Sequence, residues 1–212
     1  MERALAYPYD IPTGSYALVA GKAVQLTSAN DVDCDDRIAL LAYGSNASPN
    51  VLARKLSTRP DPVPVVRTVL RDFDVVYSAH LSLYGAVPAT LTRSSGTEAT
   101  AFIAYLTERQ LALVSATEPN YHLARFDRPS CTLDRGVAPA ELQVYLSRHG
   151  PLRLDGGEVA LAAIEARERR LPAMGQREVL ERVRDLVCPG SDLATLIREH
   201  AGSRIDLSGE KS

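Results

Sequence analysis

The sequence predicts an α+β fold in which a mixed β-sheet or small β-barrel is flanked by helices. The apolar run IALLAY, residues 38–43, is bounded by turn residues, which is typical of a strand buried on both faces. Stretches of alternating polarity follow between residues 72 and 106. The last third carries apolar residues at three- and four-residue spacing, as helices do. Strands followed by trailing helices favour the α+β class.

The composition indicates one globular domain and excludes several function classes. The chain has 212 residues, of which 45% are hydrophobic, and its 24 Lys and Arg residues nearly balance 26 Asp and Glu residues. Because the basic residues are scattered, no nucleic-acid partner is expected. The 3 Cys and 4 His residues lack metal-ligand spacing, so no metal is expected. Without an apolar run of about 18 residues, we expect no membrane contact and a cytoplasmic protein.

The chain divides into three predicted parts. Residues 1–36 are rich in Pro, Gly, Ser and Asp, which predicts an extended arm packed on the domain. Residues 37–188 form the predicted domain, and 189–212 form a C-terminal helix and tail. No heptad or apolar strip singles out an interface, so the sequence leaves the oligomeric state open.

Each predicted element has a local signal. Thr107 and Gln110 form a capping box, and Pro119 ends the helix that they begin. A Pro-rich loop precedes the strands of the middle of the chain, and an SSG turn at 94–96 separates two of them. The predicted strands are 72–82, 85–93, 97–106, 121–126 and 141–147, and the predicted C-terminal helices are 156–172, 175–187 and 191–200.

The segment AYGSNASP, residues 42–49, joins the predicted buried strand to a helix. Ser48 suits a helix cap, and Pro49 suits the first helical position. Gly44 allows backbone angles that other residues avoid, so the amides of residues 44–47 could converge near the positive end of the helix and bind a carboxylate or small oxyanion. The alternative is a tight turn that uses Gly, Ser and Asn only for their conformational tolerance.

The motif AYGSN between strand and helix resembles the signature of the γ-glutamylcyclotransferase-like family. The same order of elements follows, as RDFDVVYSAH, YGAVPATLTR, TEATAFIAYLT and ERQLALVSATE, and the resemblance covers about residues 38–187. It implies that this loop holds a γ-glutamyl group and that Glu118 is the catalytic glutamate. The substrate-binding residues implied together by the loop, the resemblance and the side-chain chemistry are Tyr43, Gly44, Ser45, Asn46, Ala47, Tyr121 and Tyr145.

The chain departs from the family pattern in two places. VSATEP, residues 114–119, replaces a pattern like LDxxEG around the glutamate, and Ala47 stands where members carry a larger apolar residue. The arm lies outside the resemblance. These departures imply a substrate that differs from that of the better-known members.

The reaction implied by the resemblance releases 5-oxoproline from a γ-glutamyl amide and needs no cofactor. The substrate's α-amine attacks its own side-chain carbonyl, and Glu118 serves as general acid and base, so the enzyme is an acyltransferase or lyase. Attack by water would make it a γ-glutamyl amide hydrolase, and a third possibility is a non-catalytic metabolite-binding module. Ser45 as a nucleophile is disfavoured, because GSN lacks the glycines of a nucleophile elbow. The leaving amine stays open.

Overall fold

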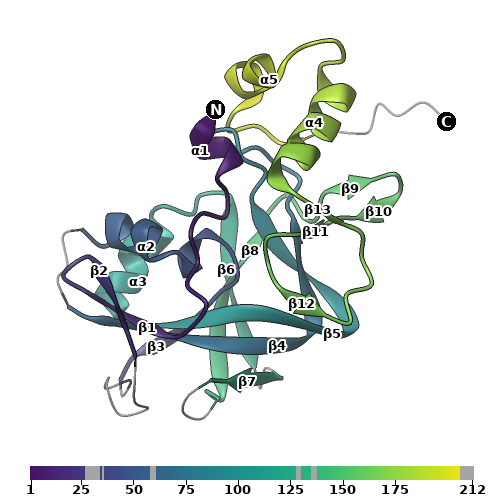
Figure 1. Ribbon diagram of the computed structural model, residues 1–212. Helices are drawn as coiled ribbons and strands as arrows, with labels where there is room; N and C mark the ends of the chain where they lie inside the picture. The colour runs from purple at the N-terminus through teal and green to yellow at the C-terminus, as the bar shows by residue number, and fades with distance from the viewer. Residues whose placement is uncertain (27–33, 35, 58–60, 128–129, 135–137, 206–212) are drawn as a thin grey trace.

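The computed structural model describes residues 1–26, 34, 36–57, 61–127, 130–134 and 138–205, and it confirms the α+β class. Its main feature is a mixed sheet with the strand order β13-β11-β4-β5-β3-β8-β6 (Figure 1). These strands are β3 (Ile38–Ala42), β4 (Val63–Tyr77), β5 (Ala89–Leu106), β6 (Tyr121–Asp127), β8 (Glu141–Ser147), β11 (Ala160–Leu161) and β13 (Ala173–Met174). β1 (Tyr16–Val19), β2 (Lys22–Gln25), β7 (Cys131–Leu133) and β12 (Ala166–Arg167) join this sheet, while β9 (Arg153–Leu154) and β10 (Gly157–Glu158) pair separately.

The apolar run predicted as a buried strand is β3. It lies inside the sheet, antiparallel to β5 and parallel to β8, and it is buried from Ala39 to Ala42. The strand therefore delivers Tyr43 and the loop that follows it to an interior position. The strand predictions for β6 and β8 are also confirmed.

A long bent ribbon of β4 and β5 replaces several shorter predicted elements. The end of the predicted Pro-rich loop is the start of β4, and the predicted SSG turn lies inside β5, which runs for 18 residues. At this point the register shifts between Arg71 and Phe73, and Asp72 and Gly96 have φ angles of 62° and 81°. The amide of Gly96 donates to Asp72 Oδ1 at 2.8 Å. A bulge of this kind bends a ribbon, so the glycine that suggested a turn marks a bend.

The bend curls the sheet without closing it. The start of β5 reaches the end of β8, where the amide of Ser147 donates to Thr90 Oγ1 at 3.2 Å. Within the described residues the end strands β13 and β6 do not pair with one another. The sheet is therefore open, and the small-barrel alternative is wrong.

The helices form two groups around the sheet. α2 (Pro49–Lys55) contacts α3 (Glu108–Ser115), while α1 (Glu2–Leu5), α4 (Gln176–Val187) and α5 (Leu193–His200) gather at one end of the molecule (Figure 1). The predicted capping box is present: Gln110 N donates to Thr107 Oγ1, and Thr107 N donates to Gln110 Oε1. This cap sets the start of the helix that leads to Glu118.

The helix predicted at 156–172 is absent, and short strands and turns take its place. β11 pairs with β4, and β12 pairs with β5, so tertiary pairing overrides the helical spacing. Glu168 has a φ angle of 52°, which an α-helix does not allow. Arg169 forms an ion pair with Asp74 of β4, whose side chain is fully buried. The segment is thus tied to the sheet.

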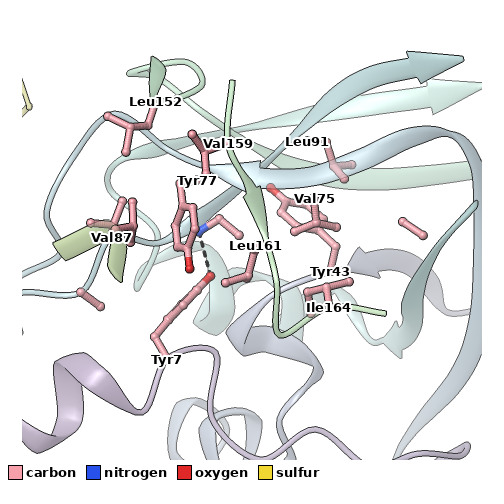
Figure 2. Close-up of a cluster of buried hydrophobic side chains, with 14 of the residues drawn as sticks. Tyr7, Tyr43, Val75, Tyr77, Val87, Leu91, Leu152, Val159, Leu161 and Ile164 are labelled. Carbon is pink, nitrogen blue, oxygen red and sulfur yellow. Dashed lines mark hydrogen bonds between the residues drawn. The ribbon is translucent and has the colours of Figure 1, made fainter. Parts of the chain in front are cut away.

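The core holds both ends of the described chain against the sheet. Figure 2 shows part of the larger cluster of buried side chains, in which Tyr7 from the arm lies near Tyr77 and its hydroxyl accepts a hydrogen bond from the amide of Ala89 at 2.8 Å. β1 pairs antiparallel with β4, so the arm contributes a helix and a hairpin where an extended segment was predicted. Leu196 and Ile205 join the same cluster. No helix in the described part of the chain is long and apolar enough to cross a membrane.

Candidate functional site

A cavity of about 430 Å³ lies beside the loop that follows β3. Its walls come from the arm, from the loop and α2, from the segment between β4 and β5, from the turn after α3, and from Tyr145 of β8. The volume falls within the range of about 300–1,000 Å³ that is common for small-molecule sites. The cavity therefore joins segments that are far apart in the sequence.

The loop presents three unpaired amides to this region. Residues Ser45–Ala47 form a 3₁₀ turn, in which the amide of Ala47 donates to the carbonyl of Gly44 at 2.9 Å. In the described part of the chain, the amides of Gly44, Ser45 and Asn46 donate to no protein acceptor, and all three residues line the cavity. Such N–H groups can hold a carboxylate or an oxyanion.

Ala47 and Ser48 do not join this group. Ala47 is buried outside the cavity, its amide is already used, and its carbonyl accepts a hydrogen bond from the hydroxyl of Tyr16. Ser48 and Pro49 occupy the N-cap and first positions of α2 as predicted, but the Ser48 side chain makes no capping hydrogen bond, because its hydroxyl oxygen is buried and has no partner among the described residues. The 3₁₀ turn holds the backbone before α2.

The turn after α3 carries Glu118 to the loop. The amide of Glu118 donates to the carbonyl of Ser115 at 3.0 Å. Its Oε1 accepts hydrogen bonds from Asn46 Nδ2 at 2.9 Å and from Lys55 Nζ at 2.5 Å. Lys55 Nζ also donates to Asn46 Oδ1 at 2.8 Å, which closes a network of three side chains. Asn46 and Glu118 therefore meet at the cavity, 72 positions apart in the chain.

Lys55 is a site residue that the sequence reasoning missed. Its side chain is 11% exposed, and that of Glu118 is 13% exposed, so water screens their ion pair only weakly. A signal was available, because Lys55 follows the buried residues Val51 and Leu52 at four- and three-residue spacing and so shares their face of α2. A lysine on the buried face of a helix is unusual unless it has a partner.

The tyrosines hold one wall of the cavity through backbone groups. Tyr43 donates its hydroxyl hydrogen to the carbonyl of Tyr145, and Tyr121 donates to the carbonyl of Ala89 at 2.9 Å. The hydroxyl of Tyr145 bonds Ser115 Oγ at 2.6 Å. Tyr7, which the sequence analysis did not single out, accepts from the amide of Ala89.

Burial keeps these phenols protonated. It is the main cause that raises the pKa of Tyr7, Tyr43, Tyr121 and Tyr145 above the usual value, and the nearby carboxylate of Glu118 raises each pKa further. They act as hydrogen-bond donors and acceptors at neutral pH, and none of them is a phenolate base.

A buried histidine completes the polar lining. His80 Nδ1 bonds Ser78 Oγ at 2.8 Å, and its ring centroid lies 4.7 Å from that of His149. Burial, followed by the nearby His149, lowers the pKa of His80 to about 4, so its imidazole is neutral at pH 7. Within the described residues, no group of three or more His, Cys, Asp and Glu side chains is arranged to hold a metal ion.

Comparisons with known proteins identify no family for the chain. The sequence matches no protein-family model and no curated protein. Among solved structures, it is similar to the SeMet-substituted allophanate hydrolase of Kluyveromyces lactis, with 8% sequence identity and a TM-score of 0.40. That similarity covers 56% of this chain and 19% of the hydrolase chain, so the present chain matches about a fifth of that protein. A likeness this weak supports no functional argument.

Proposed function

We propose that the protein is a γ-glutamylcyclotransferase-type enzyme that releases 5-oxoproline and a free amine or amino acid from a γ-glutamyl amide. The observation that carries this proposal is the hydrogen bond between Glu118 and Asn46 of the YGSN loop at the wall of the cavity. This hydrogen bond places the carboxylate of Glu118, which can transfer protons, beside the loop that carries the unpaired amides of residues 44–46. The protein would work on a small molecule, without a cofactor or nucleic acid, in the cytoplasm, where its cysteines would stay reduced.

The loop and its neighbours suit the γ-glutamyl half of such a substrate. Unpaired amides at Gly44, Ser45 and Asn46 can stabilise the oxygen of the scissile carbonyl as it becomes negative. Lys55 and Arg54, which also line the cavity, can attract the α-carboxylate. Tyr43, Tyr121 and Tyr145 shape the wall against which the substrate must fold.

The proposed reaction exchanges one bond for another and moves two protons from the α-nitrogen to the leaving nitrogen. Glu118 takes a proton from the substrate's α-ammonium, and the resulting amine attacks the γ-carbonyl carbon to form the five-membered ring. The bond from this carbon to the leaving nitrogen then breaks as Glu118 returns the proton to that nitrogen. The ring nitrogen loses its second proton in the same way, through Glu118, so the products are the neutral lactam and the leaving amine as its ammonium ion. Because amine and carbonyl belong to one molecule, the protein's main task is to hold them in the reactive conformer.

The Lys55 ion pair favours a second candidate, a binding module without turnover. The Lys55 ammonium and the Asn46 amide both contact Oε1 of Glu118, so the carboxylate is fixed and partly neutralised. Such a pair can recognise a zwitterionic ligand by exchanging partners with its ammonium and carboxylate. Hydrolysis in the same pocket is the third possibility, and its product would be glutamate.

Mass spectrometry of the products separates these candidates. Purified protein and its Glu118→Gln variant are incubated with γ-glutamyl dipeptides, glutathione and γ-glutamyl alkylamines, beside a sample without protein that measures spontaneous cyclisation. We expect 5-oxoproline from the parent protein alone. Glutamate as the product would mean a hydrolase, and binding without any product would mean a binding module.

A further inference from the structure

The arm builds a part of the cavity that the γ-glutamyl half does not require. Tyr7 and Tyr9 lie on the cavity wall, and their ring centroids are 6.0 Å apart in an edge-on arrangement. Tyr9 in turn lies 6.2 Å from Tyr84 of the segment between β4 and β5. Since Tyr7 also contacts the loop, with its hydroxyl oxygen close to Gly44, a continuous aromatic surface leads away from the YGSN loop.

A cation lies at the end of this surface. The guanidinium of Arg3 lies 4.4 Å from the ring centroid of Tyr84, as in a cation–π contact, and Arg3 forms no ion pair with any described carboxylate. Among the described residues that line the cavity, three carry a positive charge, Arg3, Arg54 and Lys55, and one carries a carboxylate, Glu118. The lining therefore has an excess of positive charge, and it favours an anionic ligand.

Tyr9 is fixed against Tyr84. Its hydroxyl oxygen is buried, and it interacts with the hydroxyl of Tyr84. Its φ angle of 72° lies in the left-handed region, which a bulky residue adopts only when the surrounding structure imposes it. The rings of Tyr9 and Tyr84 are therefore pre-organised, which lowers the entropy cost of packing a ligand ring on them.

We infer that Arg3, Tyr9 and Tyr84 form a subsite for the leaving group, and that this subsite selects γ-glutamyl conjugates of aromatic amino acids. The inference rests on the proposed function for the identity of the γ-glutamyl half. The leaving group's ring packs on Tyr9 and Tyr84, and its carboxylate pairs with Arg3 at the end of the aromatic surface. A conjugate of an aromatic amino acid carries both the ring and the carboxylate. An alanine conjugate lacks the ring, and an alkylamine conjugate lacks both groups.

The test compares matched ligands for binding and for turnover. Calorimetry with the Glu118→Gln variant measures binding of γ-glutamyl-phenylalanine, γ-glutamyl-alanine and γ-glutamyl-phenethylamine, and the parent protein is assayed with the same compounds. We expect the phenylalanine conjugate to bind about tenfold more tightly than the alanine conjugate, as for a stacked aromatic ring. Loss of the carboxylate in the phenethylamine conjugate should weaken binding about threefold to tenfold.

Variants assign these preferences to residues. Tyr84→Leu should abolish the preference for the ring, whereas Tyr84→Phe should keep it. Arg3→Gln should abolish only the preference for the carboxylate, and Arg177→Gln, on an exposed part of α4, is its matched control. Equal affinities for all three conjugates, no binding of any of them, or preferences that survive these substitutions would overturn the subsite. Selective binding without 5-oxoproline would overturn only the proposed reaction, while equally efficient turnover of all conjugates would overturn only the subsite.

Discussion

Tyr7 packs so closely on Gly44 that a β-carbon at position 44 would lie 2.6 Å from the Tyr7 hydroxyl oxygen. Real β-carbons do not approach other atoms this closely, so the arm and the loop fit together only because residue 44 is a glycine. The next atom of the Tyr7 side chain would lie at 3.7 Å, an ordinary contact distance. The conflict would therefore involve the hydroxyl group alone.

Gly44→Ala should lower the free energy of unfolding by about 1–3 kcal/mol and reduce activity, because overpacking displaces either the loop or the arm. Tyr7→Phe removes the hydroxyl, so the double variant Gly44→Ala/Tyr7→Phe should be more stable than the sum of the single changes predicts. Urea unfolding of the four proteins measures this coupling. Strictly additive effects would show that the loop and the arm do not meet in this way.

Lys55→Met should leave Glu118 without its charged partner. We expect a loss of about 1–3 kcal/mol in the free energy of unfolding, which is typical of a lost hydrogen bond to a charged group. If Lys55 also attracts the substrate, the KM of the Lys55→Met variant should be about tenfold higher than that of the parent, while 5-oxoproline is still formed. Lys22→Met on the exposed strand β2 serves as the control. A variant of unchanged stability would argue against the ion pair.

The low pKa of His80 predicts a loss of stability in acid. Its pKa is about 4 in the folded protein and about 6.5 in an unfolded chain, so between these values only the unfolded state binds the proton. Stability should therefore fall as the pH drops from 6.5 to 4, with about 3 kcal/mol from this histidine. Urea unfolding at pH 7.5 and 4.5 should show a smaller pH dependence for His80→Gln than for the parent. His122→Gln, at an exposed position, should behave like the parent.

Arg169→Met should destabilise the protein by about 3–5 kcal/mol, because it leaves the buried carboxylate of Asp74 without its cation. The double variant Asp74→Leu/Arg169→Met removes both charges and should recover part of this loss. Thermal and urea unfolding measure both effects, with Arg177→Met as the exposed control. A double variant less stable than Arg169→Met would contradict the uncompensated charge of Asp74 as the main cause of the instability.

Elements with strong local signals could be predicted from the sequence. The apolar run of β3 and the capping box of Thr107 and Gln110 specify structure within a few residues, and both appear as predicted. The sequence predicts a turn at Gly96 where the structure has a bend, because a glycine with positive φ serves either purpose and only its hydrogen bond to Asp72 distinguishes the two. The helix predicted at 156–172 failed because its apolar residues pair with distant strands.

The candidate site could be predicted only where the resemblance named its residues. The structure brings Asn46 and Glu118 together at the cavity, and the roles assigned to them stay predictions. The contribution of Tyr7 had no local signal, because its partner Ala89 is 82 residues away. Lys55 had a local signal in its spacing from Val51 and Leu52 on α2. Its pairing with Glu118 could not be predicted, because it depends on how the fold brings α2 and α3 together.

The contacts of Ala89 have a consequence for how this wall can change during evolution. Its amide holds Tyr7 and its carbonyl holds Tyr121, so the backbone of a single residue anchors two aromatic side chains. Every residue except proline carries the same two backbone groups. Residue 89 can therefore be substituted, as far as the surrounding space allows, without loss of either hydrogen bond to a tyrosine. Homologues could share this wall while having different residues at its anchor, so a search for them should compare backbone position as well as residue identity.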